Sequence, residues 1–147
     1  MGEEGEPRKT IAMLVVRERQ SRMTLATAVP SKSTGQFVVN RVMAFMKEIG
    51  IESLDVIAKS DQEPAIKCLI DKVGNAKAEF GGRWVVVSSP VDSHASNGVV
   101  ERAVQSVEGQ VRVLRSALEE KWNVKLNSKH AVIPWIMEHA AYVLNRY

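Results

Sequence analysis

Cysteine is nearly absent from the sequence. Cys68 is the single cysteine among 147 residues, which excludes a disulfide framework within the chain and a cysteine-based zinc cluster. Its neighbours Ala65, Ile66, Leu69 and Ile70 are apolar. We therefore expect Cys68 to be a small buried hydrophobic side chain rather than a catalytic thiol.

Long hydrophobic runs are also missing. No apolar stretch approaches the roughly 18 residues that a membrane-spanning helix needs, and the first ten residues, MGEEGEPRKT, do not resemble a signal peptide. These absences predict an intracellular protein without a membrane partner.

Neither sign of charge dominates the chain. Lysine and arginine contribute 20 residues and aspartate and glutamate 17, which gives a formal net charge of +3. This excess is too small to establish nucleic-acid binding, although it favours an anionic partner. Because 45% of the residues are hydrophobic and 25% are charged, we expect one globular domain over residues 1–147, with residues 1–10 flexible.

The first half of the chain predicts a hairpin followed by alternating helices and strands. Apolar patterning favours an antiparallel strand pair, and turn and capping residues then bound a helix that ends at Gly50. The expected strands are Ile11–Arg19, Met23–Val29, Ser53–Ala58 and Arg83–Ser88, and the expected helices run from Ser33 or Thr34 to Ile49 and from Glu63 to Val73.

Two helices are expected to close the chain. The first begins at Val99, and its apolar positions recur at alternating intervals of four and three residues: Val100, Val104, Val107, Val111, Leu114 and Leu118. Such a seam serves a coiled coil or packs against the helix's own domain, and we favour the second interpretation. The last helix is expected over Val132–Asn145.

This order of elements predicts the α/β class, with one mixed sheet covered by helices. In open sheets of this kind, sites form beyond the carboxyl ends of the strands. The polar segments that leave the last two expected strands are therefore the place to look for chemistry. The second of these segments, residues 91–98, is expected to be a mobile loop.

Two carboxylates stand out near these strand ends. Asp61 follows a strand, and Glu101 lies at the start of the long helix, so that both could bind a hard cation such as Mg²⁺. Asp61 also has a structural interpretation, because Ser60 and Glu63 match a helix capping box. A glutamate in the first helical turn also complements the helix dipole. Asp92 and His94 are weaker candidates in the loop.

Two motifs resemble the integrase catalytic core of retroviruses and long-terminal-repeat retrotransposons. The segment KSDQE (59–63) is followed by SNGVVER (96–102), similar to the second and third acidic motifs of that family. The segment VVRERQSRMTLATAVPSKS (15–33) is similar to its strand-turn-strand, and HAAYVLNR (139–146) to a late helix. The resemblance covers nearly the whole chain.

The resemblance implies a ribonuclease-H-like fold and a polynucleotidyl transferase that uses two Mg²⁺ or Mn²⁺ ions. Asp61 would be the second metal ligand and Glu101 the third. The family's first aspartate lies in a strand before the hairpin, where this sequence offers only Glu3, Glu4 and Glu6. We therefore expect a truncated or degenerate core that binds its metals weakly or not at all and that has little strand-transfer activity alone.

The resemblance also implies partners: donor and target DNA, a second copy of the chain, and a nuclear location if the protein is functional. Asn97, Arg102, Arg112 and Arg115 are the candidate DNA contacts. A solvated helix face is an equally good interpretation of these arginines. A non-catalytic DNA-binding or dimerising remnant and a ribonuclease-H-type nuclease remain alternative functions.

Overall fold

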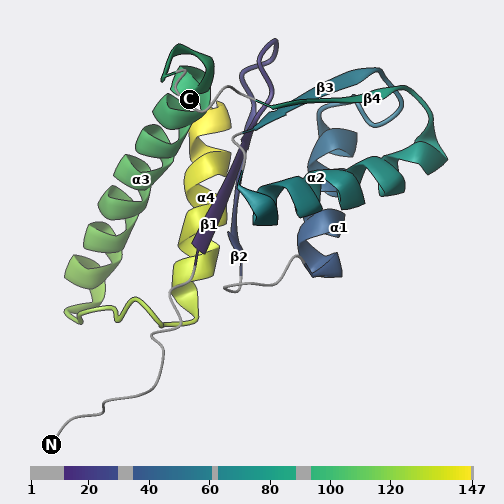
Figure 1. Ribbon diagram of the computed structural model, residues 1–147. Helices are drawn as coiled ribbons and strands as arrows, with labels where there is room; N and C mark the ends of the chain where they lie inside the picture. Colours follow the sequence, from purple (N-terminus) through teal and green to yellow (C-terminus); the bar gives the residue numbers. More distant parts are fainter. Residues whose placement is uncertain (1–11, 30–34, 61–62, 89–93, 147) are drawn as a thin grey trace, which may run out of the picture.

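The chain folds into four α-helices and four short strands over the residues that the structure describes. The computed structural model describes residues 12–29, 35–60, 63–88 and 94–146 (Figure 1). Within them the strands form two separate two-stranded sheets. The α/β class is as predicted, but the single mixed sheet is not, because no described strand joins one pair to the other.

The first sheet is the predicted antiparallel hairpin. β1 (Ala12–Arg17) pairs with β2 (Thr24–Val29) in a register that places Ala12 opposite Val29 and Arg17 opposite Thr24. The hairpin lies between two helical layers, with α1 and α2 on one side and α3 and α4 on the other (Figure 1). This double cover explains why the first four residues of β2 are buried on both faces.

The first helical layer packs on the hairpin through α1 (Gln36–Glu48). Its N-cap is Gly35, so the predicted cap at Ser33 or Thr34, which lie outside the described residues, is wrong. Gly50 ends the helix as predicted: its φ of 81° suits glycine, and its N–H donates to the Lys47 carbonyl over 3.1 Å.

The second sheet is parallel. β3 (Val56–Ser60) pairs with β4 (Trp84–Ser88) from Val56 opposite Trp84 to Ser60 opposite Ser88. The crossover is α2 (Pro64–Lys77) with a short 3₁₀ turn, Ala78–Phe80, as parallel pairing requires a long connection. β3 begins three residues later than predicted, and the carboxylate of Asp55, just before it, accepts a hydrogen bond from the Arg83 N–H over 2.8 Å.

The second helical layer consists of α3 (His94–Trp122) and α4 (Val132–Arg146). Val107 is fully buried against Ala26, Ala140 and Ala141, and the later apolar positions of α3 pack in the same layer. The seam of α3 therefore packs against its own domain, as we favoured. In the described part of the chain, no helix is long and apolar enough to cross a membrane.

Candidate functional site

The end of β3 removes one structural explanation for Asp61. Ser60 is the last residue of the strand, and the N-cap of α2 is Glu63, which makes no side-chain capping bond. Pro64 at the first helical position starts the helix instead. The capping-box interpretation of Ser60 and Glu63 is therefore wrong, and Asp61 itself lies outside the described residues.

The start of α3 changes the position of Glu101. The helix begins at His94 rather than Val99, so Glu101 is its eighth residue and lies beyond the first turn. The dipole effect fades within one turn, and that explanation for Glu101 is wrong. The expected mobile loop is helical from residue 94 onward; the remainder of it, including Asp92, lies outside the described residues.

Glu101 and Arg102 point away from the core. Both residues are exposed, and the Arg102 Nε donates to the carbonyl of Gly98 one turn earlier over 3.2 Å. Gly98 is accommodated inside the helix, where a glycine is unfavourable but tolerated. Asn97 lies in the same turn of α3, but its side chain is outside the described set.

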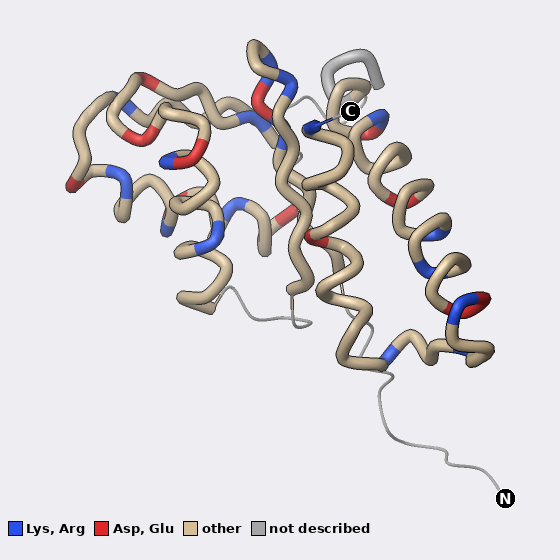
Figure 2. The backbone as a smooth tube through the Cα atoms, turned by 180° about the vertical axis from the view of Figure 1, so that it is seen from behind, with Lys and Arg blue, Asp and Glu red and all other residues tan. Residues whose placement is uncertain are grey.

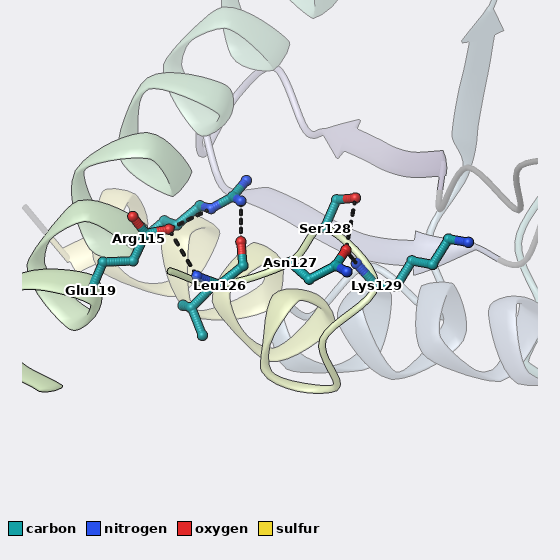
Figure 3. Close-up of polar contacts among 6 residues, drawn as sticks. All are labelled: Arg115, Glu119, Leu126, Asn127, Ser128 and Lys129. Carbon is teal, nitrogen blue, oxygen red and sulfur yellow. Dashed lines mark hydrogen bonds and ion pairs between the residues drawn. The ribbon is translucent and has the colours of Figure 1, made fainter. Parts of the chain in front are cut away.

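Arg115 holds the loop between the last two helices. Its Nε donates to Glu119 over 3.0 Å and its second nitrogen, Nη2, donates to the Leu126 carbonyl, while the same Glu119 oxygen accepts from the Leu126 N–H over 3.2 Å (Figure 3). The guanidinium thus has a structural role. Arg112 is exposed and lines a shallow hollow with Glu108.

The described residues contain no cluster of three or more His, Cys, Asp or Glu side chains that could hold a metal ion. Because Asp61 is outside them, its pairing with Glu101 stays a prediction.

Two histidines, His130 and His139, make local contacts. The His130 Nδ1 accepts from the Val132 N–H over 3.1 Å at the start of α4. His139 stacks between Trp135 and Tyr142, at ring-centroid distances of 4.7 Å and 5.7 Å.

Cys68 is exposed, so the expectation of a buried side chain is wrong. The buried face of α2 is formed by Leu69, Val73 and Lys77. A residue next to Leu69 lies about 100° away around the helix. The apolar neighbours of Cys68 therefore do not place it in the core.

Sequence reasoning missed a pocket where the hairpin turn meets the last two helices. Its volume is about 240 Å³, and it is lined by Arg17, Arg22, Thr24, Ala103, Ser106, Val107, Leu144 and Asn145. The lining residues come from β1, the hairpin turn, β2, α3 and α4, so no local motif marks it. The single signal in the sequence is the spacing of two arginines across one tight turn.

The hairpin turn beside this pocket is fixed by Glu18. Its carboxylate accepts from the backbone N–H of Gln20 over 3.0 Å and from the N–H and hydroxyl of Ser21. The hydrogen bond from the Ser21 hydroxyl, helped by the two backbone N–H groups, lowers the pKa of Glu18 below its usual value. Arg22 follows in the left-handed region, with φ at 62°.

Asn145 ties the end of α4 to the first residue of β2. Its amide oxygen accepts from the Thr24 N–H and its amide nitrogen donates to the Thr24 carbonyl, both over 2.8 Å. This two-point contact satisfies both backbone groups of a buried residue and fixes one wall of the pocket.

The sequence matches no model of a known protein family, and it matches no curated protein either.

Proposed function

We propose that the chain is an integrase-core-like domain that binds DNA and has little strand-transfer activity alone. The observation that carries this proposal is the parallel pairing of β3 with β4, because it brings the carboxyl ends of both strands to one edge. Asp61 follows β3 directly in the sequence, and Glu101 lies on the helix that follows β4.

The helix starts remove the capping-box explanation for Asp61 and the helix-dipole explanation for Glu101, which supports a functional interpretation of both carboxylates. The N-cap of α2 is two residues beyond Asp61, and Glu101 is outside the first turn of α3. Oxygen ligands of this type suit Mg²⁺ or Mn²⁺, which would activate the attacking oxygen and stabilise the leaving oxygen during phosphodiester transfer. Two carboxylates without a third should bind these ions weakly.

A nicking and strand-transfer assay on the purified chain, with Mg²⁺ or Mn²⁺ added, tests the catalytic part of the proposal. We expect no turnover above background. Glu101→Gln is the diagnostic variant, and Glu108→Gln, exposed seven residues later on the same helix, is its matched control. Robust turnover that is lost in Glu101→Gln and kept in Glu108→Gln would overturn the expected inactivity.

Metal binding is measured separately from activity. We expect addition of Mn²⁺ to broaden the backbone NMR signals nearest Glu101 at high metal concentration only, and less so in Glu101→Gln. Equal broadening in Glu101→Gln and in the unchanged chain would remove Glu101 from the ligand set. Cleavage of an RNA–DNA hybrid with no action on duplex DNA would instead favour the ribonuclease-H-type alternative.

A homodimer is the second part of the proposal. α4 presents a row of aromatic side chains to solvent, with Trp135 56% and Tyr142 48% exposed, and Arg146 lies over the Tyr142 ring at 4.4 Å. Exposed aromatic side chains are enriched in protein interfaces. Sedimentation velocity tests this expectation, and a clean monomer at high protein concentration counts against it.

A further inference from the structure

The pocket between the hairpin turn and α3 is positively charged. Two arginines, Arg17 and Arg22, line it, and none of its described lining residues is acidic. Neither arginine forms an ion pair with another described residue. Among the described residues, the two guanidinium groups make one hydrogen bond, a long one of 3.4 Å from the Arg17 Nη1 to the Thr24 hydroxyl.

The carboxylate that lies between these arginines in the sequence, Glu18, forms no ion pair with either of them. Its oxygens instead accept the N–H groups and the hydroxyl of the turn. The turn therefore uses its acidic residue internally, and Arg17 and Arg22 have no ion-pair partner in the described part of the chain. Each guanidinium has five N–H donors, so most of the donors of Arg17 and Arg22 have no acceptor among the residues that the structure describes.

The remaining lining groups suit an anion. Ser106, an exposed residue of α3, contributes a hydroxyl that can donate a hydrogen bond to the anion. The Asn145 amide instead makes two hydrogen bonds to the backbone of Thr24. Arginine is the preferred side chain for planar, two-point recognition of phosphate oxygens. At about 240 Å³ the pocket is smaller than sites for drug-sized ligands, yet it has room for a phosphate group and an attached sugar.

We infer that this pocket binds a phosphate group through Arg17, Arg22 and Ser106. In Figure 2 the basic segment of the hairpin turn lies at the same end of the molecule as the end of α4 and the first turns of α3. The site is separate from the proposed metal ligands, because Ser106 is five residues from Glu101 and lies about 140° around the helix from it. The inference depends on the proposed function only for the source of the phosphate, which is then the backbone of DNA.

The first experiment uses inorganic phosphate and needs no nucleic acid. NMR titration should shift the guanidinium Nε–H signals of Arg17 and Arg22 and leave that of Arg19 unchanged. Arg19 is the matched control, because it is exposed in the same turn and does not line the pocket. Equal shifts at all three arginines, or none, would overturn the inference.

The second experiment measures the affinity for a short fluorescent DNA duplex by anisotropy over a range of salt concentrations. The double variant Arg17→Gln/Arg22→Gln should bind about tenfold more weakly at low salt. The slope of log affinity against log salt concentration should become shallower by an amount that corresponds to roughly one to two phosphate contacts. Arg19→Gln should have a much smaller effect. Circular dichroism verifies that each variant remains folded.

The two experiments separate the sources of the ligand. Phosphate shifts together with a selective loss of DNA affinity support a backbone phosphate as the ligand. Phosphate shifts in a chain that does not bind DNA support the pocket and contradict the DNA-binding part of the proposed function. The double variant removes two positive charges and Arg19→Gln removes one. An equal loss of DNA affinity per charge removed in the two variants overturns the pocket as a defined site.

Discussion

The indole of Trp84 lies directly against Gly74, where a Cβ would come within 2.5 Å of the Trp84 Cδ1 atom. This contact joins α2 to the first residue of β4 and lets the helix approach the parallel sheet closely. Trp84 also packs on the core cluster that contains Leu69 and Val73. The glycine is therefore required by packing, not by backbone conformation.

Gly74→Ala is expected to destabilise the protein although alanine favours helices. A methyl group at this position overlaps a rigid indole ring, and overpacking of this kind costs about 1–3 kcal/mol. Urea unfolding gives the change in the free energy of unfolding. Gly109→Ala is the control, because its nearest atom, the Arg112 Nη2, is 3.9 Å away. The control should gain about 0.5–1 kcal/mol, and a gain at Gly74 as well would contradict the close contact.

Glu119→Ala is expected to loosen the loop between α3 and α4. Glu119 accepts hydrogen bonds from Arg115 and from the Leu126 N–H, and its side chain is only 28% exposed. The expected loss is about 1–2 kcal/mol, because a partly buried N–H and a guanidinium both lose their acceptor. Thermal unfolding measures it. The same substitution at the exposed neighbour Glu120 should change stability by less than about 0.5 kcal/mol.

Acid is expected to weaken the two turns that carboxylates hold together. The pKa of Asp55 is lowered, chiefly by the hydrogen bond from the Arg83 N–H, and the pKa of Glu18 is lowered by its bonds to Ser21. A group with a lowered pKa in the folded state contributes stability above its unfolded pKa, and that contribution is lost as the pH falls through the folded pKa. Stability should therefore decrease below the usual carboxyl range.

Asp55→Asn gives the direct measurement of this effect. The variant should be less stable than the unchanged chain at neutral pH, and the difference should shrink as the pH falls, since protonation removes the same charge. Urea unfolding at several pH values measures both curves. A difference that stays constant with pH would show that the Asp55 charge contributes nothing to folding.

Cys68 is expected to react with a thiol reagent in the folded protein. Its side chain is exposed on α2, so a chromogenic disulfide reagent should label it without denaturant. The reaction in denaturant supplies the reference, and Cys68→Ser is the blank. Reaction only after unfolding would show that Cys68 is buried in the folded protein, as the sequence predicts, and would contradict its exposed position.

Local patterns in the sequence predict which segments are helices and which are strands. The expected helix from Ser33 or Thr34 to Ile49 lies within a few residues of α1, the expected Val132–Asn145 helix within one residue of α4, and the expected Met23–Val29 strand within one residue of β2. These signals are local because each depends on which face of one element is buried. Capping residues were less informative, since Gly35 and Glu63 serve as N-caps without side-chain bonds.

Helix starts and sheet pairing depended on information that the local pattern lacks. Asn97-Gly98 predicts a loop, but a glycine in a long helix costs only about 1 kcal/mol, and α3 tolerates this cost. The division into two sheets depends on contacts between distant residues. The phosphate pocket depends on them too, since Arg17, Ser106 and Asn145 meet only after the hairpin has packed on both final helices.

β4 has a consequence for the behaviour of the protein at high concentration. The strand is uncharged, and its three central valines, Val85, Val86 and Val87, are 40–47% exposed. Among the described strands it pairs only with β3, so its other edge carries backbone donors and acceptors without a strand partner. An apolar open edge of this kind can template pairing between molecules. We therefore expect association between molecules at high protein concentration to begin at this edge of β4.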